Sequence, residues 1–101
     1  MHTRILVVED ETITAEVIKM MLEREGYEIS AIVDSGEKAL AKAKSAPPDL
    51  ALMDIILSGE MDGIETANQL RARYNIPIVY LTASTDQATL KRAKITEPYA
   101  Y

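Results

Sequence analysis

The sequence predicts an α/β fold: a doubly wound, parallel, five-stranded sheet with helices packed against it. Short apolar runs alternate with segments of helical spacing along the whole chain, and this alternation indicates βαβ units and a parallel sheet. The 101 residues are enough for one domain with one core and too few for two. In the commonest five-stranded order of this class, 2-1-3-4-5, the first and third strands are neighbours.

The first predicted strand is the apolar run ILVV at residues 5–8, as expected for a strand that is covered on both faces. In the segment that follows, Ile13, Val17 and Met21 recur at helical spacing. Gly26 is placed to end this helix, because glycine is the residue that helix C-termini favour. The first βα unit is therefore predicted to end near residue 26.

The middle of the chain repeats this unit. Residues 29–33 are the second strand candidate, and Ser35 can cap a second helix that Pro47-Pro48 terminates. Residues 50–53, LALM, are the third strand, and Asp54 follows them directly. The apolar residues predicted for the second helix are Ala39, Leu40 and Ala43.

The last part of the chain contains a further helix, a strand and the beginnings of another unit. Asp62 opens a third helix, and IVYL at residues 78–81 is the fourth strand. A helix is predicted from about residue 86 to 94, and residues 99–101 begin a fifth strand that is incomplete. The apolar face of the third helix consists of Ile64, Ala67 and Leu70. The residues Tyr27, Tyr74 and Tyr80 are interpreted as packing residues.

Charge and composition exclude several kinds of partner and several kinds of chemistry. The formal net charge of -5 argues against nucleic acid or an anionic membrane as the main partner. The chain has no cysteine, so disulfides, thiolate metal sites and thiol chemistry are excluded. Neither a signal peptide nor an apolar stretch of the ~20 residues that a membrane span requires is present. We therefore expect a cytoplasmic protein.

Polar residues follow three of the predicted strands at their carboxyl ends, where parallel sheets place their functional crevice. They are Glu9 and Asp10 after the first strand, Asp54 after the third, and Thr82 after the fourth. Neighbouring carboxylates resist ionising together unless a cation is present, and Mg²⁺ is a cation that carboxylates bind. A carboxylate beside such an ion can act as a nucleophile toward a phosphoryl group, and a hydroxyl can hold the transferring oxygens. Asp54 is the candidate nucleophile, and Thr82 is placed to supply the hydroxyl.

Each of these residues also has a simpler explanation. Glu9 and Asp10 could merely begin the first helix, since acids favour that position. Asp54 could be a turn residue, and Thr82 could be an ordinary threonine at the end of a strand. Their joint position on the strand ends of one βαβ pattern favours a common site.

The sequence resembles the receiver domain of two-component response regulators, the CheY-like family with a flavodoxin-like fold. Three segments carry the resemblance: ILVVEDE at 5–11, LMDIILSGEMDGIE at 52–65 and PIVYLTAS at 77–84. Their order covers essentially the whole chain, so residues 1–101 are expected to be one receiver domain. The resemblance implies that the chain is a phosphoacceptor and not a dedicated enzyme. A sensor histidine kinase or a phosphotransfer protein would supply the phosphoryl group.

The resemblance also assigns a role to each site residue. Asp54 is the phosphoacceptor, and Mg²⁺, for which Mn²⁺ can substitute, is held by Glu9, Asp10, Asp54 and the backbone carbonyl of Ile56. Thr82 is the switching hydroxyl, and the small Ala83 leaves room for the phosphoryl group. Tyr101 lies where the family has its rotating aromatic residue.

Two departures from the family pattern are visible. The loop from Asp54 to Gly63 is one residue longer than in the commonest receivers. The family's lysine belongs three residues after the aromatic, and the chain ends at that aromatic, so the domain is C-terminally incomplete and lacks its last helix. We expect apolar side chains of the first and third strands to lie open on the face that this helix covers. A homodimer through that face, or through the fifth strand, is therefore expected.

Two other functional classes compete with this interpretation. A pseudo-receiver that is never phosphorylated would be an interaction module, and the missing lysine is its only support. A metal-dependent phosphohydrolase commonly needs a second acid two residues after its nucleophile, where this chain has Ile56. A flavin-binding protein is disfavoured because no phosphate loop rich in Ser, Thr and Gly follows the first strand.

Overall fold

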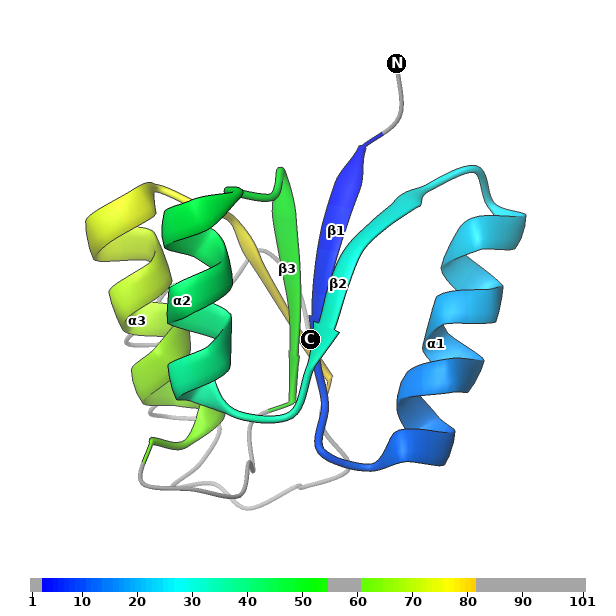
Figure 1. The fold of residues 1–101 in the computed structure, drawn as a ribbon, viewed down its shortest axis with the longest axis horizontal. Helices are drawn as coiled ribbons and strands as arrows, with labels where there is room; N and C mark the ends of the chain where they lie inside the picture. Colours follow the sequence, from blue (N-terminus) through cyan, green and yellow to red (C-terminus); the bar gives the residue numbers. More distant parts are fainter. Residues whose placement is uncertain (1–2, 55–60, 82–101) are drawn as a thin grey trace.

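The structure is a computed structural model that describes residues 3–54 and 61–81. In this part of the chain, four parallel strands form one sheet in the order β2-β1-β3-β4. Helix α1 lies on one face of the sheet, and α2 and α3 lie side by side on the other (Figure 1). The elements are β1 (Arg4–Val8), α1 (Thr12–Arg24), β2 (Glu28–Val33), α2 (Gly36–Ser45), β3 (Leu50–Asp54), α3 (Gly63–Tyr74) and β4 (Ile78–Leu81).

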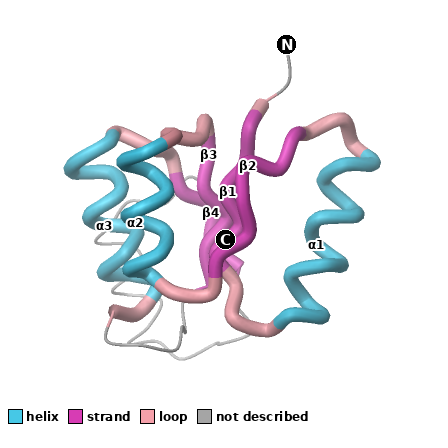
Figure 2. The backbone as a smooth tube through the Cα atoms, viewed as in Figure 1, coloured by secondary structure: helices cyan, strands magenta, loops and turns pink. Residues whose placement is uncertain are grey.

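This arrangement confirms the predicted doubly wound fold and the first four positions of the order 2-1-3-4-5. Figure 2 shows the strands as a single layer between the helices. The helix predicted near residues 86–94 and the fifth strand predicted at 99–101 lie outside the described residues. None of the helices in the described ranges is long and apolar enough to cross a membrane.

Most of the core lies between the sheet and the pair α2 and α3. Alternate strand residues point toward these helices, because side chains of a strand alternate between its two faces. Ala39 and Ala43 are fully buried, and their small side chains let α2 lie close to the sheet. The core cluster consists of Leu6, Val8, Ala39, Ala43, Ala51, Met53, Ile64, Ala67, Leu70, Ile76, Ile78 and Tyr80.

Helix boundaries follow local signals in the sequence. Ser35 Oγ accepts a hydrogen bond from Lys38 N at 3.2 Å, and Asp62 Oδ1 accepts one from Glu65 N at 2.9 Å. Both are N-caps that satisfy an unpaired amide of the first turn. At the end of α1, Gly26 has a φ of +92°, and the next amide, that of Tyr27, donates to Leu22 O at 3.0 Å. This is the Schellman motif, which requires a residue that tolerates positive φ.

The α1 side of the sheet differs from the expectation. The prediction that apolar side chains of the first and third strands lie open was wrong for the first strand, because Ile5 and Val7 are buried. In the third strand, Leu50 and Leu52 are half-buried. β1 is an interior strand and α1 lies against it and β2 (Figure 1). Among the described residues, the large exposed apolar side chains are instead on α1 and the turn after it. They are Ile13, Val17, Met20, Met21 and Tyr27, so the interpretation of Tyr27 as a packing residue was also wrong.

Candidate functional site

Three carboxylates meet at the carboxyl end of the sheet. Glu9 and Asp10 follow β1, and Asp54 is the last residue of β3. Each offers one carboxylate oxygen, and these three atoms all lie within 4.8 Å of one another. Glu9 is buried, Asp54 is half-buried and Asp10 is exposed. The cluster therefore extends from the interior of the domain to its surface.

The strand register explains this meeting. Val8 of β1 is paired with Met53 of β3, so the residues that follow each of them, Glu9 and Asp54, lie at the same level of the sheet. Val8 and Met53 point into the core beneath α2 and α3, and alternation turns the next side chain away from that core. The Glu9 amide donates to Val33 O of β2 at 3.0 Å, which holds the chain in register beyond the strand.

Burial and charge act together on Glu9. Burial, which has the largest effect, and the neighbouring carboxylates of Asp54 and Asp10 together raise the pKa of its carboxyl group from 4.5 to about 7. The amide of Glu11 donates to Glu9 Oε1 at 3.1 Å and opposes part of this rise in pKa. Without a cation, the Glu9 carboxyl group is therefore partly protonated near neutral pH, whereas a free glutamate is ionised there.

The donor set fits a hard divalent cation. Carboxylate oxygens are the ligands that Mg²⁺ prefers, and it commonly uses one or two of them together with water. The three acids would relieve their mutual repulsion by binding such an ion. The other predicted site residues, Ile56, Thr82, Ala83 and Tyr101, lie outside the described residues. The structure thus brings together every predicted site residue that it describes.

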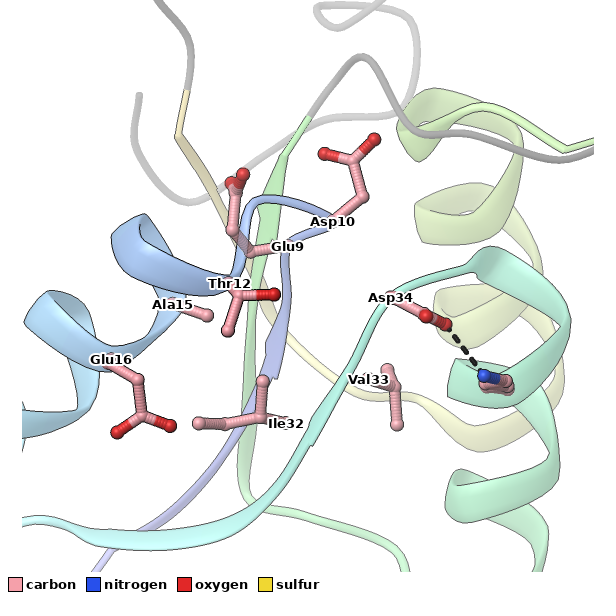
Figure 3. Close-up of a pocket in the computed structure, with 9 residues that line it drawn as sticks. Glu9, Asp10, Thr12, Ala15, Glu16, Ile32, Val33 and Asp34 are labelled. Atoms are coloured by element: carbon pink, nitrogen blue, oxygen red, sulfur yellow. Dashed lines mark ion pairs between the residues drawn. The ribbon is translucent and has the colours of Figure 1, made fainter.

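Beside the acids is a hollow of about 220 Å³. Figure 3 shows Glu9 and Asp10 at its rim, with Thr12 and Glu16 of α1 on one side and Asp34 opposite. Lys38 Nζ forms an ion pair with Asp34 Oδ1 at 2.9 Å across the start of α2. The hollow belongs to the same site, because it shares Glu9 and Asp10 with the acid cluster.

The sequence analysis did not single out a second set of contacts, which lies where the chain enters α3. Glu37 Oε1 accepts a hydrogen bond from the backbone amide of Met61 at 3.3 Å. A Cβ atom added at Gly36 would collide with Thr66 Oγ1 and lie 3.1 Å from Met61 Cβ. The glycine at the first position of the second helix was the available signal, but its partners are distant in the sequence and no local pattern reveals them.

Comparison with known proteins places these features in a family context. A sequence profile described as "Response regulator receiver domain" matches residues 5–99. DNA-binding response regulator MtrA of Mycobacterium tuberculosis is 43% identical over 86 residues, which are 85% of this chain and 37% of MtrA. Transcriptional regulatory protein ResD of Bacillus subtilis is 42% identical over 87 residues, which are 86% of this chain and 35% of ResD. The chain spans little more than a third of these relatives.

Solved structures agree with this result. The signal receiver domain of a modulated diguanylate cyclase from Desulfovibrio desulfuricans superposes with a TM-score of 0.96 at 40% identity, covering 100% of this chain and 80% of that one. The receiver domain of the sensor histidine kinase PA1611 from Pseudomonas aeruginosa gives a TM-score of 0.86 at 31% identity, covering 100% of this chain and 84% of that one. The second structure is described as having a magnesium ion coordinated in its active site cleft.

Proposed function

This chain belongs to the response regulator receiver domain family, and we propose that it receives a phosphoryl group on Asp54. Receiver domains of response regulators interact with histidine kinases or phosphotransfer proteins. We propose the same class of donor for this chain. It would act as a phosphoacceptor that promotes its own phosphorylation and dephosphorylation, and not as a dedicated enzyme.

The observation that carries this proposal is the position of Asp54 within 4.8 Å of Glu9 and Asp10. In the proposed step, one Asp54 carboxylate oxygen attacks the phosphorus atom of the donor. A new O–P bond forms, and the bond from phosphorus to the donor's nitrogen breaks. The electron pair of that bond leaves with the imidazole of the donor histidine. Asp54 then carries an acyl phosphate, whose hydrolysis by water restores the carboxylate.

Mg²⁺ is the cofactor that we propose, with Mn²⁺ as a substitute. Asp10, Asp54 and Glu9 would hold it, with Glu9 acting mainly through water. When bound, the ion would neutralise negative charge on the transferring phosphoryl oxygens. The magnesium ion in the related receiver of PA1611 supports this assignment. The predicted roles of the Ile56 carbonyl, Thr82, Ala83 and Tyr101 remain part of the proposal.

We also propose self-association through α1. Ile13, Val17 and Met20 follow the spacing i, i+4, i+7 and form one exposed stripe, while the buried Ala15 marks the face toward the sheet. The net charge of -5 disfavours an anionic membrane as the cover for this stripe. A second copy of the chain is the proposed occupant, in place of the sheet face that was expected from the sequence.

Mass spectrometry after treatment with acetyl phosphate and Mg²⁺ tests the phosphoacceptor assignment. The wild-type chain should gain one phosphoryl group at Asp54, and Asp54→Asn should gain none. Asp49→Asn is the matched control, because Asp49 is an exposed aspartate just before β3, at the opposite end of that strand from Asp54. Equal labelling of Asp54→Asn would refute the assignment. A wild-type chain that takes no phosphoryl group would favour a pseudo-receiver that acts as an interaction module.

A further inference from the structure

Met61 is held by contacts from two helices. Its backbone amide donates to Glu37 Oε1 at 3.3 Å, across 24 positions of sequence. Its Sδ atom lies 3.4 Å from Gln69 Nε2 of α3. Gly36 faces it so closely that a Cβ atom there would lie 3.1 Å from Met61 Cβ and 3.3 Å from Met61 Cε. The first turn of α2 and the second turn of α3 therefore fix the position of this residue.

Met61 lies on the connection between Asp54 and α3, so the contacts that hold it also bear on the acidic site. The strand β3 ends at Asp54, and the chain that leaves it must reach α3 through Met61 and the helix cap Asp62. Thr66 Oγ1 donates to Asp62 O at 2.8 Å, so the residue after Met61 is also held by α3. Glu37 also lies in the first turn of α2, where the partial positive charge of the helix N-terminus attracts an acidic side chain.

We propose that Glu37 is a positioning residue for the phosphoacceptor site. It anchors Met61 to α2 and so sets where the chain returns from Asp54 toward α3. This inference rests on the proposed function of Asp54. It requires no contact between Glu37 and the phosphoryl group, so Glu37 acts through Met61 and has no chemical role of its own.

The simpler explanation is that Glu37 merely improves the start of α2. An acid there would stabilise the helix through its charge, and its removal would lower the melting temperature without changing the chemistry at Asp54. Glu37→Gln separates the two explanations. Glutamine loses the charge and keeps an oxygen that can accept from Met61 N. Under the simpler explanation, Glu37→Ala and Glu37→Gln both keep the reactivity of the wild-type chain. Only the positioning role predicts that Glu37→Ala loses reactivity and that Glu37→Gln regains it.

The experiment compares Glu37→Ala and Glu37→Gln with the wild-type chain. Glu23→Ala is the matched control, because Glu23 is an exposed acid on α1, across the sheet from Met61. Three quantities are measured at constant pH and Mg²⁺: the rate of labelling by acetyl phosphate, the Kd for Mg²⁺, and hydrogen exchange at the Met61 amide by NMR. Circular dichroism establishes that each variant keeps its helices.

We expect Glu37→Ala to speed exchange at Met61 and to slow labelling by about two- to tenfold, the range that the net contribution of one hydrogen bond gives. Glu37→Gln should keep most of the wild-type labelling rate and most of the wild-type protection of the Met61 amide. Glu23→Ala should match the wild-type chain in both quantities. Unchanged labelling in Glu37→Ala would overturn the proposal even if exchange at Met61 became faster, as would a loss of labelling rate in Glu37→Gln equal to that in Glu37→Ala. If the wild-type chain takes no phosphoryl group, the proposed function fails. The rate of exchange at Met61 and the Kd for Mg²⁺ then still show whether Glu37 anchors Met61 and positions the acidic site.

Discussion

Glu9 and Asp54 lie at the same level of two neighbouring parallel strands, with carboxylate oxygens within 4.8 Å of each other. One of them is buried and the other is half-buried. Two carboxylates at this separation repel each other when both are ionised, so either one of them holds a proton or a cation lies between them.

Without metal, the stability of the protein should fall as the pH rises through the range from about 4.5 to about 7. The pKa of Glu9 is raised from 4.5 to about 7 in the folded state. Between these values the folded state binds more protons than the unfolded state, so the free energy of unfolding decreases with pH. Urea denaturation at several pH values without divalent metal measures this, and Glu9→Gln should flatten the dependence. A slope that Glu9→Gln leaves intact would assign it to other groups.

Removal of Asp10 should weaken Mg²⁺ binding more than removal of Glu9. The exposed Asp10 can bind an ion directly, whereas the buried Glu9 already accepts a hydrogen bond from Glu11 N at 3.1 Å. We expect Asp10→Asn to raise the Kd for Mg²⁺ by roughly tenfold or more. Glu9→Gln should raise it by a smaller factor, because Glu9 is proposed to reach the ion mainly through water. Isothermal titration at pH 8, where Glu9 is ionised, measures both. The reverse ranking would contradict the division of roles.

Gly36→Ala should destabilise the domain by about 1–3 kcal/mol, the usual range for overpacking a filled contact. The added methyl group would collide with Thr66 Oγ1 and press on Met61. Thr66→Ala removes the first of these obstacles, so the double variant should lose less stability than the sum of the single variants. Gly26→Ala is an informative control, because nothing lies within 4 Å of its added methyl group. Its cost should come from the φ of +92° alone.

Self-association through α1 should depend on the exposed apolar stripe. Val17→Glu places a charge among Ile13, Met20 and Met21 and should shift the protein to monomers, because a buried unpaired charge opposes association. Asn68→Glu adds the same charge on the exposed side of α3 and should leave the association unchanged. Light scattering over a range of concentrations measures both. A wild-type chain that stays monomeric at every concentration would show that α1 is not a dimer interface.

The features that were predicted correctly from sequence are those with local signals. Ser35 and Asp62 cap the helices that follow them, and Gly26 ends α1, because capping depends on residues a few positions apart. The meeting of Glu9, Asp10 and Asp54 could also be predicted, since parallel strands bring their carboxyl ends to one edge. In each case the interacting groups are either close in sequence or fixed by the order of the strands.

The features that were missed depend on contacts between distant elements. Glu37 and Met61 are joined by a hydrogen bond across 24 positions, and the motif at 52–65 that contains Met61 does not indicate a partner in α2. The exposure of Tyr27 and the burial of Ile5 and Val7 depend on where α1 lies over the sheet. The helical spacing of Ile13, Val17 and Met21 predicted a helix correctly, but spacing does not tell which apolar stripe faces the core.

Helix α1 has one buried residue, Ala15, whereas α3 has five. Native proteins open in parts, and the parts with the least buried apolar surface open at the lowest free energy. Amide protons of α1 should therefore exchange with solvent through a partial opening that leaves α2, α3 and the sheet folded. Since Glu9 and Asp10 form the link between β1 and α1, an ion that binds them would raise the free energy of that opening. Binding of an ion at the acidic site would then lower the frequency with which α1 detaches from the rest of the domain.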